Sequence, residues 1–299
     1  MDFELPLWVL PVLGSALGLG FYDLCKKHAV PENSVIPVLF YATLCGSALF
    51  TLMTFLAGDW HACVFCSRSA WILVLLKSLL VAASWTCVYY AMRDLPISLA
   101  SPIRASAPLW TFFGSMILYS EIPTLWQGVG MLSIFAGYYF FSVFGKLEGF
   151  SFRDSRGMHL IVLGTLLGAA SALYDKYLLG VLHLPRGTVQ FWFSVDLVWI
   201  LGLAYAVRSF CFGQKHAFQW RWSIPATGIL LIAADYLYFY ALSLPDTYIS
   251  VVSLVRRCNC LVTFFVGVVW FREKNIKRKA FALALILLGV FLLALASKK

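Results

Sequence analysis

Ten long apolar runs divide this sequence, and their length limits what the chain can fold into. A helix needs roughly 20 apolar residues to cross about 30 Å of hydrocarbon, and each run is close to that length. The breaks between them carry polar, Gly or Pro residues, and the period-two alternation of a membrane β-barrel is absent. We therefore predict an all-α integral membrane protein with ten transmembrane helices. The expected spans are approximately residues 5–26, 34–57, 69–91, 96–119, 124–145, 157–181, 187–208, 223–243, 247–271 and 278–297.

The composition excludes a soluble domain. Hydrophobic residues make up 61% of the 299 residues and charged residues only 12%, whereas soluble proteins carry about 25% charged residues. The acidic start "MDFELPLWVL" has no basic region, so we expect a retained first span rather than a cleaved signal peptide. The net charge of +9 is attributed to loops that orient the protein and contact lipid, because no basic block is long enough to bind nucleic acid.

Several residues recur 152 positions further along the chain. Chance matches are common in apolar sequence, but charged residues at one constant offset are not. The offset of 152 changes only at the turn between the third and fourth spans, where Tyr90 and Tyr240 lie 150 positions apart. The pairs at 152 are Tyr22-Asp23 with Tyr174-Asp175, Arg104 with Arg256, Glu121 with Glu273, Gly137 with Gly289, and "TFF" at 111–113 with 263–265.

This repeat predicts two five-helix units, residues 1–146 and 157–299, joined by a linker loop at 147–156. Because five is an odd number, the second unit must enter the membrane inverted. Inverted repeats with a site near the midplane are typical of secondary carriers that work by alternating access. An old duplication retained only for packing is the alternative interpretation.

Two corresponding stretches carry a family resemblance. They are "YYAMRDLPISLASPIRASAPLWTFFGSMILYSEIPTLWQGVGMLSIFAG" and "YFYALSLPDTYISVVSLVRRCNCLVTFFVGVVWFREKNIKRKAFALALILLG". Each has a Tyr-Ala pair before a Pro-containing turn, a span that ends near Glu, and a last span that bears Gly. The sequence thereby resembles the drug/metabolite transporter superfamily, and most closely its ten-helix EamA-type exporters and permeases. The resemblance implies the fold, a transport function, and both termini in the cytoplasm.

Ionisable residues inside the spans are candidates for function. Each costs about 2.5–3.5 kcal/mol on insertion scales and usually faces a cavity or a partner. At about 1.5 Å per helical residue, Arg104 and Arg256 lie near mid-membrane, and Asp235 lies level with Arg256, which predicts an ion pair. Three interpretations remain open: structural ion pairs, recognition of a carboxylate or phosphate by guanidinium groups, and proton coupling. The basic residues within spans are Lys77, Arg104, Lys176, Arg256 and Arg257, and the acidic ones are Asp23, Asp175, Asp196 and Asp235.

These residues define a predicted substrate site. Its proposed binding residues are Arg104, Arg256, Arg257 and Lys77, with Trp85, Tyr90 and Tyr240 lining the cavity, and Asp23, Asp175 and Asp235 gating it or coupling protons. We expect Asp23 to form a local surface pair with Lys26 and Lys27. Asp175 lacks such a local partner and is the better candidate for a gate. Glu121 and Glu273 are expected to cap the fifth and tenth spans, which they begin.

Enzyme chemistry is not supported by the motifs. All five histidines lie in loops or at span ends, and no phosphate-binding Gly-rich loop is present. The isolated "HACVFC" lacks the four ligands of a metal site, so no metal or cofactor is expected. We predict a secondary transporter of a small anionic or zwitterionic metabolite; a flippase for a phosphate-bearing lipid headgroup and a lipid-metabolism enzyme are the alternatives. The expected partners are that solute or headgroup and membrane lipids, in a monomer or homodimer.

The orientation in the membrane has two conflicting indications. The loops after the odd-numbered spans carry 14 Lys and Arg residues, against 4 on the side of the termini. The positive-inside rule then predicts that both termini lie outside, whereas the family resemblance implies that they lie inside. The expected location is the bacterial inner (plasma) membrane.

Overall fold

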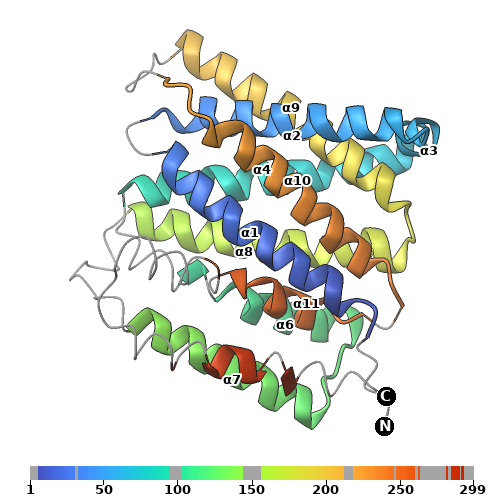
Figure 1. Cartoon of the computed structure of the whole chain (residues 1–299), viewed down its shortest axis with the longest axis vertical. Helices are drawn as coiled ribbons and strands as arrows, with labels where there is room; N and C mark the ends of the chain where they lie inside the picture. Colours follow the sequence, from blue (N-terminus) through green and yellow to red (C-terminus); the bar gives the residue numbers. More distant parts are fainter. Residues whose placement is uncertain are drawn as a thin grey trace.

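The computed structural model of the chain describes residues 6–30, 33–94, 103–104, 106–143, 156–211, 218–245 and 247–259, with short pieces at 262, 281, 284–289 and 291–292. Regular structure in these residues is helical (Figure 1). A helix satisfies its own backbone hydrogen bonds, which lipid cannot do, and this favours helices for apolar segments. The helices are α1 (Val9–Ala29), α2 (Val35–Leu56), α3 (Trp60–Val64), α4 (Arg68–Asp94), α6 (Ala107–Tyr119), α7 (Leu125–Val143), α8 (Arg156–Lys176) with the π-helix η1 (Tyr177–Val181), α9 (Arg186–Cys211), α10 (Ser223–Leu242) and α11 (Ile249–Arg256).

Six of the described helices are long and apolar enough to cross a membrane: α1, α2, α4, α8 with η1, α9 and α10. They coincide with the first three and the sixth to eighth expected spans. Two shorter apolar helices, Ala107–Tyr119 and Leu125–Gly137, fall in the fourth and fifth. The protein is therefore a multi-pass membrane protein, as predicted.

The remaining expected spans are only partly described. In the fourth, Ile103 and Arg104 are helical and α6 begins at Ala107, with Pro108 in its first turn, where the missing N–H costs nothing. In the ninth, α11 ends at Arg256 and a turn follows. The parts of these spans at 96–102, 105, 260–261 and 263–271, much of the tenth, and Glu273 lie outside the described residues.

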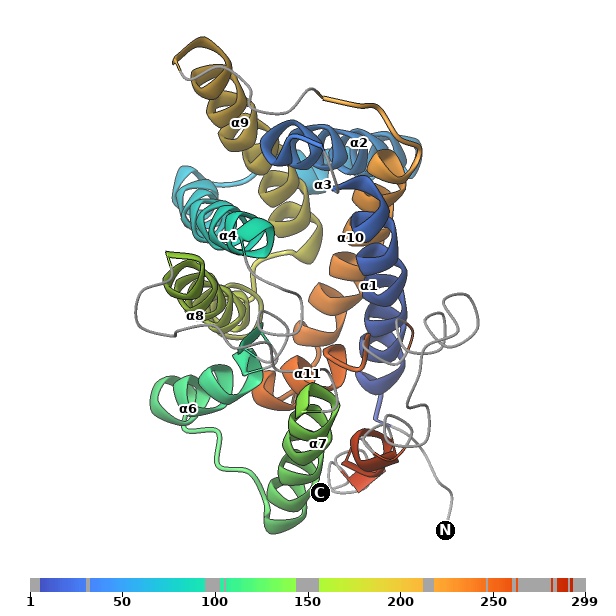
Figure 2. The same ribbon diagram turned by 90° about the vertical axis from the view of Figure 1, so that its left-hand side faces the viewer.

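Two antiparallel helix pairs form the centre of the molecule. In Figures 1 and 2, α1 runs alongside α10, and α4 runs alongside α8. Small residues allow the close approach: a Cβ atom on Gly164 of α8 would lie 2.7 Å from a methyl group of Val88 on α4. The main hydrophobic core joins α1, α4, α8, α9, α10 and α11, and includes Val12, Val81, Leu197 and Phe239. Polar side chains on the inner faces of these helices are thereby brought together.

Candidate binding site

A cavity of about 200 Å³ lies among the central helices. Its lining comes from α1, α4, α6, α8, α9, α10 and α11, together with Arg104 before α6 and Arg257 after α11. Charged side chains are unusually frequent in it for a space inside an apolar bundle. They are Lys26, Lys77, Arg104, Arg256, Arg257, Asp175 and Asp235.

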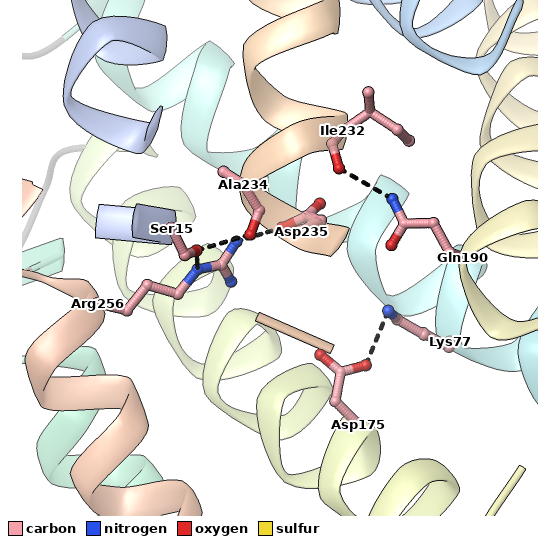
Figure 3. Close-up of polar contacts among 8 residues, drawn as sticks. All are labelled: Ser15, Lys77, Asp175, Gln190, Ile232, Ala234, Asp235 and Arg256. Atoms are coloured by element: carbon pink, nitrogen blue, oxygen red, sulfur yellow. Dashed lines mark hydrogen bonds and ion pairs between the residues drawn. The ribbon is translucent and has the colours of Figure 1, made fainter. Parts of the chain in front are cut away.

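Arg256 forms the predicted ion pair with Asp235. Its Nη2 atom donates a hydrogen bond to the Asp235 carboxylate, and its Nε atom donates to Ser15 Oγ at 3.0 Å (Figure 3). Ser15 in turn donates to the carbonyl of Ala234 at 2.7 Å. The guanidinium also lies 4.1 Å from the ring centre of Tyr238. Three helices, α1, α10 and α11, are therefore joined at this point.

Lys77 and Asp175 form a second ion pair, with Nζ and Oδ1 2.8 Å apart (Figure 3). The ammonium group also lies 3.7 Å from the ring centre of Phe193 and 3.9 Å from that of Phe239. Asp175 lacks a local partner of the kind that Asp23 has, but it pairs with a residue of another helix. Its partner is on α4, and the sequence does not indicate that α4 and α8 are neighbours.

Arg104 differs from Arg256 and Lys77 in its contacts. It is half-buried and lines the cavity, and it lies within electrostatic range of Asp23 and Tyr89. Among the described residues, no hydrogen bond or ion pair to its guanidinium group is found. A permanent positive charge therefore faces the cavity, and none of the described carboxylates is in contact with it.

Lys26 belongs to the site although the sequence did not suggest it. It pairs with Asp23 at 3.0 Å, as predicted, but it is buried and lines the cavity rather than the surface. Its Nζ atom lies 4.7 Å from the ring centre of Tyr22. Asp23 also accepts a hydrogen bond from Asn259 Nδ2 at 2.7 Å. Lys26 was missed because the first span was expected to end there, whereas α1 continues to Ala29.

The aromatic lining is shifted from the expected residues. Trp85 lines the cavity, but Tyr90 and Tyr240 do not; Tyr89 and Tyr238 do. Tyr90 instead accepts a hydrogen bond from Arg208, and the Tyr240 ring lies 4.5 Å from the Arg186 guanidinium. Neighbouring residues point about 100° apart around a helix of 3.6 residues per turn, and depth alone does not indicate direction.

Glu121 caps a different helix from the one expected. Its buried carboxylate accepts hydrogen bonds from the N–H of Ile249 at 3.2 Å and from the Ser250 hydroxyl at 3.3 Å. It thus stabilises the first turn of α11, while α7 begins later, at Leu125. The loop between α6 and α7 is in this way attached to the helix that carries Arg256.

The charges around the cavity do not balance. Of the described residues, five basic side chains and the carboxylates Asp175 and Asp235 line the cavity, and Asp23 pairs with Lys26 beside it, so positive charge is in excess. Each carboxylate already contacts one of these bases. The described residues contain no cluster of His, Cys, Asp and Glu suited to a metal ion. The lining of the cavity therefore carries a net positive charge.

Residues 6–143, which include Lys26, Lys77, Trp85 and Arg104, match the model of the EamA-like transporter family. Residues 6–143 are therefore an EamA-like transporter domain. The protein is a membrane transporter, and this family is not one of enzymes, as the sequence predicted. A solved crystal structure has the same fold, with a TM-score of 0.75 over 97% of both chains at 16% sequence identity; it is one of 29 matching chains. No curated protein matches the sequence.

Proposed function

We propose that this EamA-family transporter is a secondary carrier that moves a small anionic or zwitterionic organic metabolite by alternating access. The carrying observation is the cavity lined by five basic side chains and two carboxylates, with a third carboxylate, Asp23, paired to Lys26 beside it. Guanidinium groups remain charged at any relevant pH and grip oxyanions at two points. In this proposal, Arg104, Arg256, Arg257 and Lys77 bind the solute, and Trp85 forms a wall of its site.

The proposed architecture is ten helices in two inverted five-helix repeats. The helix contacts support it: if α1 corresponds to α8 and α4 to α10, the α1–α10 pair corresponds to the α8–α4 pair, and both exist. The same exchange, with α2 matched to α9 and α6 to α11, relates the α2–α10 contact to the α9–α4 contact. A bundle without internal symmetry would have no reason to contain both members of each pair.

Individual hydrogen bonds support the same architecture. The N–H of Ser106 donates to the carbonyl of Ile103 at 3.1 Å, and 152 positions later the N–H of Cys258 donates to that of Val255 at 3.0 Å. Ser133 Oγ donates to the carbonyl of Leu285, again 152 positions away. Contact between residues at equivalent positions is what a two-fold axis between the repeats requires. The two tight turns lie directly after Arg104 and Arg256.

The aspartates have a proposed gating role. Asp23, Asp175 and Asp235 each hold one base of the cavity. An arriving anion competes with these carboxylates for the bases, and each exchange breaks a contact between two helices or within one. Proton uptake by a released aspartate would couple transport to a proton gradient.

The test is uptake into proteoliposomes by Arg104→Gln and Arg256→Gln, with Arg156→Gln as the control because Arg156 is exposed at the start of α8. We expect the first two variants to lose anion uptake while remaining monodisperse in detergent, and the control to retain it. Normal transport by both cavity variants would exclude the recognition role. Failure to fold would instead favour structural ion pairs. Movement of a fluorescent phospholipid between leaflets, without solute uptake, would favour a flippase.

A further inference from the structure

We infer that the solute is a small carboxylate without an ammonium group, and that its carboxylate binds Arg104 in the way that Asp235 binds Arg256. This inference rests on the proposed function and specifies its substrate class. Four observations carry it. They are the correspondence of residues between the two repeats, the contacts of Arg104 and Arg256, the basic partners of the carboxylates, and the volume of the cavity.

Comparison of equivalent positions in the two repeats shows that Arg104 lacks the polar partners of Arg256. Arg104 and Arg256 are 152 positions apart, whereas Tyr90 and Tyr240, near the ends of the preceding helices α4 and α10, are 150 positions apart. At this offset, the position that corresponds to Asp235 is occupied by Trp85. The position that corresponds to Ser15 is occupied by Leu167. The two polar partners of Arg256 therefore have apolar counterparts in the other half.

The contacts of the two arginines in the structure agree with this difference between the two repeats. Arg256 contacts a carboxylate, a hydroxyl group and an aromatic ring. Arg104 has no such polar partner among the described residues, although Trp85 and Arg104 line the same cavity. A solute carboxylate at Arg104 would supply the missing anion, and Trp85 would offer an apolar wall to the rest of the molecule. The contact between Arg256 and Asp235 is thus an internal example of the contact that we propose between Arg104 and the solute carboxylate.

The carboxylates in and beside the cavity already contact basic side chains. Asp23 contacts Lys26 and Asn259, Asp175 contacts Lys77, and Asp235 contacts Arg256. An added cation would also lie among five basic side chains, and like charges placed together at a binding site are strongly unfavourable. The cavity therefore favours an acid over the corresponding amino acid.

The cavity also limits size. A volume of about 200 Å³ equals roughly seven water molecules at about 30 Å³ each. Typical ligand pockets are larger, about 300–1,000 Å³. A short-chain organic acid fits this space better than a nucleotide or a lipid headgroup with its glycerol.

The first experiment places an internal carboxylate beside Arg104. Trp85→Asp should make an ion pair with Arg104 and block uptake of acids, whereas Trp85→Asn and Trp85→Phe should retain at least part of it. Thermal unfolding of Trp85→Asp and Trp85→Asn, each with and without Arg104→Gln, measures the interaction energy between the introduced carboxylate and Arg104. We expect Trp85→Asp to be more stable than Trp85→Asn only when Arg104 is present. Equal stability differences in both backgrounds would overturn the proposed geometry, even if uptake depends on Arg104.

The second experiment compares matched solutes in proteoliposomes that contain the wild-type protein. The probes are 2-oxoisovalerate with valine, and phenylpyruvate with phenylalanine, which differ in an oxo group against an ammonium group. We expect uptake of at least one 2-oxo acid to exceed that of its amino acid by about tenfold or more. Preferred uptake of the amino acids would overturn the inference while leaving the proposed function in place. Uptake of organic cations with none of either set would instead contradict the proposed function.

Discussion

Two ion pairs line the same cavity in different surroundings. The side chains of Lys77 and Asp175 are 2% and 7% exposed, and two aromatic rings lie against the ammonium group. The side chains of Arg256 and Asp235 are 19% and 11% exposed, and Ser15 shares the guanidinium group. The first pair is sealed by the bundle, whereas the second is partly open to the cavity. Burial therefore makes the first pair the stronger link between helices and the second pair the one that a solute reaches first.

The largest effect is expected from breaking the sealed pair. Lys77→Met leaves the Asp175 carboxylate buried without its partner, and loss of one member of a buried pair costs about 3–5 kcal/mol. Removing both charges in Lys77→Met/Asp175→Leu should restore most of that loss. Thermal unfolding in detergent, followed by size-exclusion chromatography, measures both. If the single variant is as stable as the wild type, the pair is not sealed and the contrast with Arg256 disappears.

A smaller effect is expected from the open pair. Asp235→Asn keeps a hydrogen-bond acceptor for Arg256, and water in the cavity can solvate the guanidinium group. Loss of the charge-assisted bond should therefore cost about 1.5–3 kcal/mol, less than Lys77→Met under the same conditions. A larger loss for Asp235→Asn would reverse the order of the two pairs.

The smallest effect is expected at Ser15. Ser15→Ala removes the acceptor of the Arg256 Nε atom and the hydroxyl that donates to Ala234. Arg256 keeps Asp235, so the stability change should be about 0.5–1.5 kcal/mol. Anion affinity should fall less than in Arg256→Gln. Equilibrium binding of a radiolabelled acid that the wild type transports measures this; a loss equal to that of Arg256→Gln would mean that Ser15 positions the guanidinium.

Much of the fold could be predicted from the sequence because the membrane requires long apolar helices. The first three and the sixth to eighth expected spans agree with the helices to within a few residues. The short helix α3 was not expected, because it is held by distant contacts: Trp192 Nε1 donates to the carbonyl of Val64, and Thr188 donates to that of Ala62. A five-residue helix has no apolar period that could reveal it.

The depth of the site residues in the membrane could be predicted, but the direction in which their side chains point could not. Depth along antiparallel neighbours was enough to pair Asp235 with Arg256, and both arginines do line one cavity. The partner of Asp175 and the helix capped by Glu121 depend on which distant helices are neighbours, and a single sequence does not give this. Tyr90 was expected in place of Tyr89 because a one-residue step changes which way a side chain points without changing its depth appreciably.

The central claim is that the cavity binds an organic anion through Arg104. The most direct measurement is the charge displacement when solute is added to proteoliposomes on a solid-supported membrane. We predict a transient current with the sign of negative charge entering the protein when a short-chain carboxylate is added, and its loss in Arg104→Gln but not in Arg156→Gln. Currents evoked by organic cations, with none from carboxylates, would contradict the account.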